Sequence, residues 1–241
     1  MMRGDSFILR VCGGLVAGHD EACTAPIAFS TRKVGALLSF LALSPHGVWA
    51  SISGQASRPL QIESLGASIL LAAHQLAGTA LTMDVSHGSN NLVGSLPDQL
   101  ALGQAVLQIL VIVAIWIGFL RGPADRERLL RTCAACVCAF IAFGKVLSPQ
   151  YLVWLLPLVP LIRGRRGLVA GALLVAAMLT TQLWFPYRYL ELVYEFDARA
   201  SWFVFSRDLA LVALLAALVW PRRRALAGDG TVSRSGPALA D

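Results

Sequence analysis

Charged residues are scarce in this chain. Only 14% of its 241 residues are Asp, Glu, Lys or Arg, whereas a soluble domain has about 25%. Hydrophobic residues make up 56% of the chain, and the mean hydropathy is +0.66. A soluble protein needs more charge to cover its surface, so the composition predicts an integral membrane protein.

Sequence signatures of metal, cofactor and nucleic-acid sites are also lacking. There is no zinc ligand set, phosphate-binding glycine loop or dinucleotide fingerprint, so neither a metal nor a cofactor is predicted. Cys133, Cys136 and Cys138 lie in an apolar stretch without further ligands, which favours buried thiols over a metal or redox site. The net charge is +6, but Arg-rich loops beside apolar segments suit anionic lipids, so no nucleic acid is expected as a partner.

Long apolar segments stand where charge is absent. A helix that crosses about 30 Å of hydrocarbon needs about 20 apolar residues. Four segments have about this length and three are shorter, which predicts an all-α fold, a polytopic membrane bundle of about six to seven transmembrane helices. The long segments are residues 64–83, 101–120, 167–185 and 201–220, and the short ones are residues 34–43, 129–144 and 151–162.

The distribution of Arg predicts the orientation of these segments, because positively charged loops stay in the cytoplasm. Arg-rich groups at residues 121–131, 163–166 and 222–224 agree with one another and predict a multi-pass plasma-membrane protein with a cytoplasmic C-terminus. Residues 84–100, 145–150 and 186–200 then lie outside, and the loop of residues 45–63 lies in the cytoplasm. The predicted parts of the chain are a lead-in (1–33), a transmembrane domain (34–224) and a disordered tail (225–241).

Lys145-Val-Leu-Ser-Pro-Gln150 interrupts the apolar run between residues 129 and 162. It places an ammonium group and a helix break at the edge of a membrane. A Lys in or beside hydrocarbon costs several kcal/mol unless it snorkels or meets an anion, so Lys145 is a candidate site residue. The alternative is a loop Lys that reaches lipid headgroups.

Polar residues near other helix ends provide further candidates. His87 and Asn90 lie in the Gly- and Asn-rich residues 86–91, which predict a loop over the external face. His87 is either part of a site or a solvated bystander. Arg207 and Asp208 lie within the last apolar segment, where they either neutralise each other or place Arg207 to grip a phosphate.

Three further groups have mainly structural interpretations. Glu63 either caps the following helix, together with Gln61 and Ser64, or belongs to a site. Gln104 and Gln108 share a helix face and are expected to form hydrogen bonds between helices. The aromatic residues near helix ends predict an interfacial belt; they are Trp49, Trp154, Trp184, Tyr187, Tyr189, Tyr194 and Trp202.

Four segments carry a family likeness when they are taken in order. They are Arg58-Pro-Leu-Gln-Ile-Glu-Ser64, Ser86-His87-Gly88-Ser89, Gly144-Lys-Val-Leu-Ser-Pro-Gln-Tyr-Leu-Val-Trp154 and Gln182-Leu-Trp-Phe-Pro186. Together they resemble actinobacterial membrane glycosyltransferases of the GT-C fold, in particular glycosyltransferase family 87, the polyprenyl-phosphate-mannose-dependent mannosyltransferase type. The resemblance covers about residues 34–220 and implies the C-terminal part of a GT-C-like architecture.

The resemblance implies transfer of a hexose, in this family mannose, from a polyprenyl-phosphate donor to an external glycan or glycolipid acceptor. Cations at the membrane edge would hold the donor phosphate, and His87 would help to shape the donor pocket. The implied substrate-binding residues are Lys145, His87, Arg207, Arg58, Gln150, Glu63 and Asn90.

This sequence also departs from the family pattern. Family members are longer, and their catalytic Asp or Glu lies in a first external loop within a half that has no counterpart here. The resemblance therefore implies a truncated enzyme without its acidic base, which needs a second chain to supply N-terminal helices. Asp84 and Asp98 border the predicted external loop and could act as bases only in a different mechanism. The alternative is a non-catalytic membrane protein, either a lipid-binding or transport subunit or a remnant of such an enzyme.

Overall fold

The computed structural model describes residues 43–123 and 125–220. The predicted lead-in, nearly all of the first short apolar segment, the Arg group at 222–224 and the tail lie outside these residues. The chain divides into two compact units, one ending at Arg58 and the other beginning at Pro59. Helix α2 (Pro45–Ala56) belongs to the first unit and has proline in its first turn, where the missing N–H is no loss. The sequence placed residues 45–63 between two apolar segments and gave no expectation of a helix there.

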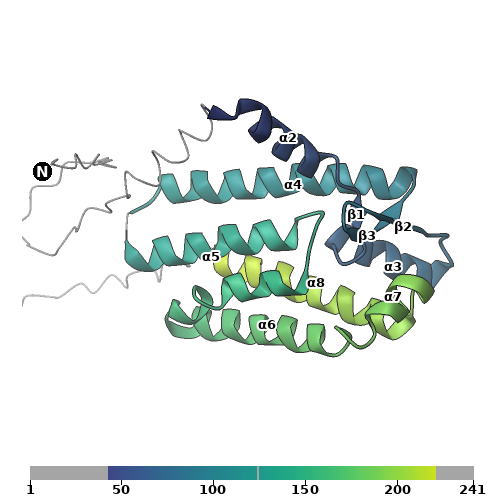
Figure 1. Cartoon of the computed structure of the whole chain (residues 1–241). Coiled ribbons are helices and arrows are strands. Elements are labelled where there is room, and N and C mark those ends of the chain that lie inside the picture. Colours follow the sequence, from purple (N-terminus) through teal and green to yellow (C-terminus); the bar gives the residue numbers. More distant parts are fainter. Residues whose placement is uncertain (1–42, 124, 221–241) are drawn as a thin grey trace, which may run out of the picture. The chain divides into compact units, whose positions relative to one another are not determined.

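The second unit is mostly helical, but it also contains a small sheet, so the all-α prediction is corrected (Figure 1). Three antiparallel strands are arranged in the order β1-β3-β2. The elements in chain order are β1 (Leu60–Gln61), α3 (Leu65–Ala77), β2 (Thr82–Ser86), β3 (Ser89–Val93), α4 (Ser95–Leu120), α5 (Arg126–Ala142), the 3-10 helices η1 (Pro149–Leu155) and η2 (Val159–Leu161), α6 (Gly164–Gln182), α7 (Tyr189–Glu195) and α8 (Ala198–Val219).

A two-residue turn forms the hairpin where a loop was predicted. Ser86 pairs with Ser89, and the residues between them, His87 and Gly88, both have positive φ angles of 54° and 71°. Turns with two positive φ angles match the twist of antiparallel strands, which explains why a Gly beside His closes a hairpin here.

Helix α3 is shorter than the apolar segment that predicted it. It ends at Ala77 because Gly78 adopts a left-handed conformation with φ of 67°. Thr82 and Met83, predicted to be helical, belong to β2. The 13 residues of α3 extend only about 20 Å, less than the hydrocarbon thickness.

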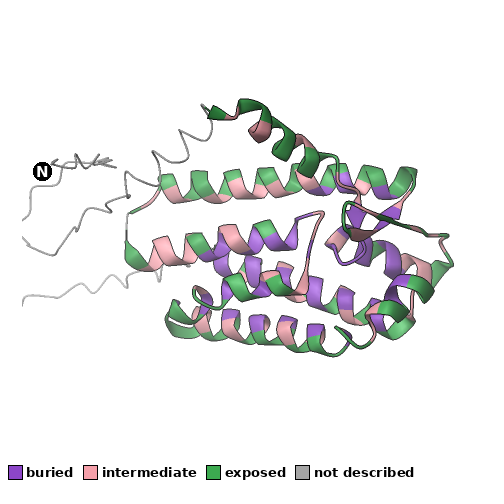
Figure 2. Ribbon diagram, in the orientation of Figure 1, coloured by how far each residue is buried: buried purple, intermediate pink, exposed green. Residues whose placement is uncertain are grey.

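Two of the described helices, α4 and α8, are long and apolar enough to cross a membrane. They differ in how far the unit covers them: 11% of the apolar window of α4 is buried, against 39% for α8. Figure 2 shows this contrast, with exposed and half-buried positions along most of α4. The apolar side chains of α4 therefore face outward, towards lipid or another protein.

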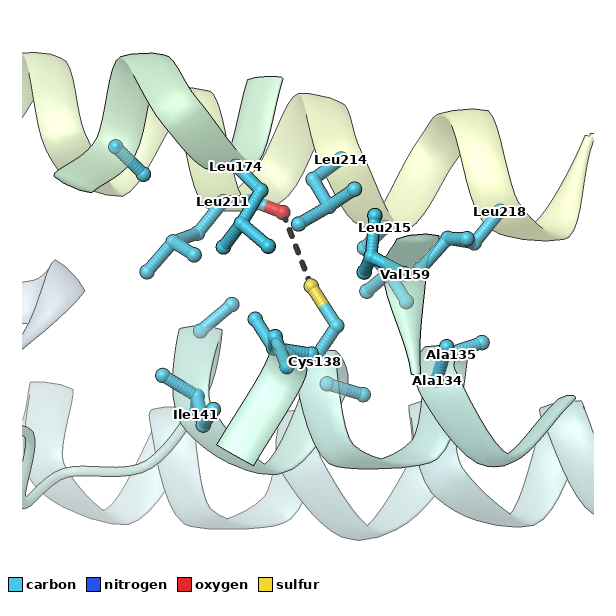
Figure 3. Packing of buried hydrophobic residues seen from close by; sticks show 14 of the residues in the cluster. Ala134, Ala135, Cys138, Ile141, Val159, Leu174, Leu211, Leu214, Leu215 and Leu218 are labelled. Atoms are coloured by element: carbon cyan, nitrogen blue, oxygen red, sulfur yellow. Dashed lines mark hydrogen bonds between the residues drawn. The ribbon is translucent and has the colours of Figure 1, made fainter. Parts of the chain in front are cut away.

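Helix α8 is central to the packing of the second unit and contacts α3, α5, α6 and α7. Leu211 and Leu214 of α8 meet Cys138 of α5 and Leu174 of α6 in the main hydrophobic cluster (Figure 3). The Cys138 thiol donates to the Leu211 carbonyl at 3.4 Å. Cys138 is thus a buried thiol as predicted, whereas Cys133 is exposed and Cys136 is half-buried.

The sheet, α3 and α7 gather at one end of the second unit, and the connection from α4 to α5 lies at the other end (Figure 1). At the sheet end the Gln61 amide donates to the Lys145 carbonyl at 3.0 Å. Residues 60–63 were predicted to lie across the membrane from residues 145–150, and that prediction is wrong. The short α3 and the hairpin after it return the chain to the end from which it started.

Candidate functional site

A layer of buried polar side chains lies at the sheet end of the second unit. Polar groups are costly to bury unless they are paired, so their partners define what the layer can do. The buried polar residues of this layer are Gln61, Glu63, Ser64, Ser68, Asn91, Arg207 and Asp208.

Arg207 lies at the centre of this layer, on α8, and is 0% exposed. Its Nε donates to Asp208 Oδ1 at 3.0 Å, and its Nη2 donates to the Glu63 carbonyl. The guanidinium also lies over the ring of Trp184, 5.7 Å from its centroid. The predicted self-neutralising pair is confirmed, and Arg207 joins α8 to the junction between β1 and α3.

Glu63 is the second ionisable group of the layer. Its carboxylate oxygen Oε2 accepts from Gln61 Nε2 at 3.2 Å. Burial raises the pKa of Glu63 to about 7, although the nearby charge of Arg207 opposes this rise. Both protonation states of Glu63 are therefore populated near neutral pH.

The predicted helix cap belongs to Ser64 rather than to Glu63. The Ser64 hydroxyl accepts from the Ala67 amide at 3.4 Å at the start of α3, as expected of an N-cap residue. The Glu63 side chain instead faces Gln61. The capping interpretation is thus confirmed for Ser64, and Glu63 belongs to the buried layer.

Main-chain bonds tie Lys145 to this layer. Strand β1 lies between β3 and the Lys145 segment, since the Gln61 amide bonds Lys145 on one side and the Ile62 amide donates to the Asn90 carbonyl at 3.0 Å. The helix break predicted at residues 145–150 is confirmed, because α5 ends at Ala142 and η1 begins at Pro149. Lys145 itself is half-buried.

Gln104 of α4 fixes the same loop from the opposite side. Its Oε1 accepts from the Gly66 amide, and its Nε2 donates to the Gly144 carbonyl, both at 2.7 Å. Gln108 donates to the Phe140 carbonyl of α5 at 2.8 Å. The prediction that both amides bond between helices is confirmed, and Gln104 links the start of α3 to the residue before Lys145.

Aromatic residues complete the layer, and the sequence named them only as members of an interfacial belt. Asn90 Nδ2 donates to the Tyr189 hydroxyl at 2.8 Å, and burial raises the pKa of Tyr189. The Tyr189 ring stacks on Trp184, with centroids 6.1 Å apart. Trp184 is fully buried, so the prediction of an interfacial belt is wrong for this residue. In the sequence, Trp184 was linked to the other candidate site residues only because it lies within the segment from Gln182 to Pro186 that carries part of the family likeness.

Two predicted site residues lie apart from this layer, and a third belongs to the other unit. His87 is exposed in the hairpin turn, and Gln150 is exposed beside a groove of about 260 Å³ between η1 and α6. Arg58 ends the first unit, so its position is described only within that unit. The structure thus brings together Glu63, Asn90, Arg207 and the backbone of Lys145.

The candidate bases at this end are exposed and not part of the buried layer. Asp98 lies in the first turn of α4, where a carboxylate favours the helix dipole. Asp84 lies on β2 opposite Asn91. Among residues 43–123 and 125–220, no group of three or more His, Cys, Asp or Glu is arranged to hold a metal ion.

The comparison with protein families gives a match over residues 73–219, to the family described as mannosyltransferase (PIG-M). This match spans more than half of the chain and includes α4 to α8. The chain belongs to the mannosyltransferase (PIG-M) family. Neither the curated proteins nor the solved structures contain a match to it.

Membership of the mannosyltransferase (PIG-M) family supports a membrane glycosyltransferase function of GT-C type, with a sugar donor and an acceptor as substrates. The two apolar helices α4 and α8 agree with a membrane location. The matched residues include Asn90, Lys145 and Arg207, whereas Glu63 lies before the match begins.

Proposed function

We propose that this chain is the C-terminal part of a mannosyltransferase of the glycosyltransferase family 87 type. It transfers mannose from a polyprenyl-phosphate donor to a glycan or glycolipid acceptor on the outer face of the plasma membrane. The family match and the apolar helices support this proposal. The observation that carries it is the fixed position of Lys145, at the break between α5 and η1 and beside the buried polar layer.

In the proposed reaction, the acceptor hydroxyl oxygen bonds to the anomeric carbon of mannose. The bond between that carbon and the phosphate oxygen breaks, and its electron pair leaves with the polyprenyl phosphate. The hydroxyl proton passes to a carboxylate that acts as general base. We assign that carboxylate to a second chain, which supplies further N-terminal helices.

Lys145 is proposed to hold the donor phosphate. Its carbonyl is held by the Gln61 amide, and the preceding Gly144 carbonyl is held by Gln104. These bonds hold the Lys145 backbone at the break after α5, and an ammonium group carried there suits a point charge that meets a phosphate as it leaves. Asn90 lies at the same end and offers an amide to the sugar.

In this proposal Arg207 does not bind the donor phosphate, which was the role that the resemblance implied for it. A residue that is 0% exposed cannot touch a donor while it remains paired with Asp208. Arg207 is therefore a positioning residue, which holds the Glu63 carbonyl and, through β1, the Lys145 loop. His87 and Gln150 remain proposed contributors to the outer part of the donor pocket, and Arg58 remains a proposed substrate-binding residue.

The test is a transfer assay with radiolabelled polyprenyl-phospho-mannose and the purified full chain, with and without the proposed second chain. Lys145→Ala should raise the donor KM about tenfold to a hundredfold, which corresponds to the loss of a hydrogen bond to a charged group. Lys145→Arg should retain most of the affinity. The matched control is Arg163→Ala, which removes an exposed charge at a distance from the sheet end.

An unchanged donor KM in Lys145→Ala would overturn the role of this residue. Absence of transfer in every combination, with donor binding intact, would instead favour the second candidate function, a non-catalytic lipid-binding or transport subunit. The burial of both carboxylates of the polar layer favours that candidate, since Glu63 is 2% exposed and Asp208 is 1% exposed. Neither can reach an acceptor hydroxyl in this arrangement.

We also propose the wider membrane arrangement, with about six spans now that α3 is too short to cross, residues 34–224 as one transmembrane domain and the C-terminus in the cytoplasm. Cysteine accessibility in intact cells tests it. A cysteine at position 145 should react with an impermeant maleimide from outside, and one at position 230 should react only after the cells are opened. Labelling of position 145 from the cytoplasm alone would reject the external donor site.

A further inference from the structure

A second groove, besides the one between η1 and α6, lies far from the sheet end of the second unit, beside the connection from α4 to α5. Its volume is about 720 Å³, and residues of α4, α5 and α8 line it. This size is within the range of about 300–1,000 Å³ that is usual for ligand pockets. Gly118 lines this groove and follows Gln104 along α4. At about 1.5 Å per residue the two residues are about 21 Å apart along the helix axis. The groove is therefore separate from the buried polar layer.

The walls of this groove are apolar and come mainly from the two helices that are able to span a membrane. Val111 and Ile115 of α4 face it from one side, and Leu215 and Leu218 of α8 face it from the other. Hydrocarbon is thus the natural filling for its inner part, because both walls belong at membrane depth.

The rim of the groove is charged and is held in place by hydrogen bonds. Arg128 donates from its side chain to the carbonyls of Phe119 at 3.0 Å and Pro123 at 3.3 Å, and its guanidinium lies 5.5 Å from the centre of the Phe119 ring. Asp125 Oδ1 accepts from the Arg128 amide at 2.8 Å, as the N-cap of α5. A fixed cation therefore lies at the mouth of an apolar groove.

Arg131 and Thr132 extend this rim by nearly one helical turn and also line the groove, as does the carboxylate of Glu127. Guanidinium groups and a hydroxyl match the oxygen atoms of a phosphate. Asp125 and Glu127 also line the mouth and balance the charges of Arg128 and Arg131 over the whole rim, so an anion is favoured locally, at the adjacent Arg131 and Thr132.

We propose that this groove binds an anionic phospholipid. One acyl chain lies between α4 and α8, and the phosphate meets Arg131 and Thr132 beside the fixed Arg128. The two membrane-length apolar walls favour this ligand over a soluble anion, and the Arg131 charge beside the Thr132 hydroxyl favours it over a lipid without net charge. The site is independent of the proposed transfer reaction, and its test does not use that reaction.

Gly118 provides a direct way to block the groove. A Cβ atom at this glycine would meet nothing within 4 Å, so a side chain can extend from this wall of the groove without a clash at its Cβ, while the Gly118 carbonyl still accepts from Arg128. Gly103 is a matched control, because it lies on the same helix, outside the groove, and also has open space at its Cβ position. The paired variants are Gly118→Phe and Gly103→Phe.

Native mass spectrometry of the full chain, released from detergent with either phosphatidylglycerol or phosphatidylcholine, measures the retained lipid. The wild type should retain phosphatidylglycerol about fivefold better, as expected for about 1 kcal/mol per Arg near an anionic headgroup. Gly118→Phe should lose this retention, Gly103→Phe should keep it, and Arg131→Gln should remove the preference between the two lipids.

Equal retention by Gly118→Phe and the wild type would overturn the proposed location, and equal retention of the two lipids by the wild type would overturn the proposed selectivity. Retention of neither lipid would overturn the site itself. If phosphatidylglycerol bound only after deletion of residues 221–241, the chain's own C-terminal segment would be the occupant and the proposal would fail. If Gly118→Phe did not fold, Gly118→Leu would replace it under the same criteria.

Discussion

Glu63 combines almost complete burial with a pKa that is raised to about 7 from an ordinary value of 4.5. The carboxyl lies among Gln61, Arg207 and Asp208, and Glu63 is almost completely shielded from water. Desolvation outweighs the attraction of Arg207, because Arg207 already pairs with Asp208. Stability should therefore respond to pH through Glu63.

The pH prediction for Glu63 follows from the direction of its pKa shift. The folded state holds the proton more tightly than the unfolded state, so the free energy of unfolding falls as pH rises from 4.5 to 7. The decrease should reach about 3 kcal/mol, at 1.36 kcal/mol per pKa unit. Glu63→Gln should remove this decrease when denaturant unfolding in mild detergent is measured from pH 5 to pH 8.

The control for that experiment is Glu195→Gln, because Glu195 is exposed at the end of α7. This variant should keep the pH dependence of the wild type. If Glu63→Gln also kept it, Glu63 would not be the group that titrates between the two states.

Arg207 and Asp208 should depend on each other for stability. Arg207→Met leaves the Asp208 carboxylate buried beside no cation and should cost about 3–5 kcal/mol. The double variant Arg207→Met with Asp208→Leu should cost at least about 2 kcal/mol less than the single variant, because no charge is stranded. Unfolding in mild detergent of the wild type, both single variants and the double variant completes the cycle.

An exposed ion pair serves as the comparison for this cycle. Arg188 and Glu191 lie 3.3 Å apart on the surface. Arg188→Met should change stability by less than about 1 kcal/mol. A double variant of Arg207 and Asp208 that was no more stable than Arg207→Met would refute the coupling.

At the scale of elements, Gln104 shows how one side chain can hold three segments together. It accepts from the start of α3 and donates to the loop after α5, while its own helix is α4. Such a residue replaces the main-chain pairing that irregular segments lack. The position of the Lys145 loop therefore depends on α4 as much as on the sheet.

Gln104→Leu should destabilise the fold by about 2–4 kcal/mol, because it leaves the Gly66 amide and the Gly144 carbonyl buried without partners. Gln108→Leu on the same helix should cost about 1 kcal/mol, since it removes one bond, to Phe140. Chemical unfolding of both variants in the same detergent tests the difference. Equal losses of stability would show that the two hydrogen bonds of Gln104 contribute no more than the single hydrogen bond of Gln108.

At the scale of the whole molecule, the outward apolar face of α4 is the main unpaired surface of the second unit. Its members include Leu102, Val106, Ile109, Leu110, Val113 and Trp116, all of which are exposed. Exposed apolar surface of this extent needs lipid or partner helices. It agrees with a chain that works within a membrane and beside further helices.

Ile109→Lys tests the membrane position of α4, since Ile109 is 62% exposed near the middle of that helix. A Lys at the centre of a spanning helix should cost about 2.5–3.5 kcal/mol of insertion free energy. Alkaline extraction of membranes should therefore release more of this variant than of Tyr187→Lys, whose parent residue is 91% exposed between α6 and α7. Equal extraction of the two variants would place α4 outside the hydrocarbon.

Several features could be predicted from the sequence because they depend on local properties of the chain. Apolar length and low charge identified the helices α4 and α8, and Pro149 within a polar interruption identified the end of α5. The pairing of Arg207 with Asp208 was also predictable, because adjacent opposite charges in an apolar helix have few other partners.

Other features depend on contacts between residues far apart in the chain, and no local pattern contains them. The early end of α3, the hairpin and the bond from Gln61 to Lys145 place Glu63 beside residues that a regular span would have put across the membrane. Burial of Arg207 and Trp184 follows from the same folding of the chain. Hydropathy and helix breaks thus identified a membrane protein with a cation at a chain reversal, whereas long-range hydrogen bonding selected the residues that surround it.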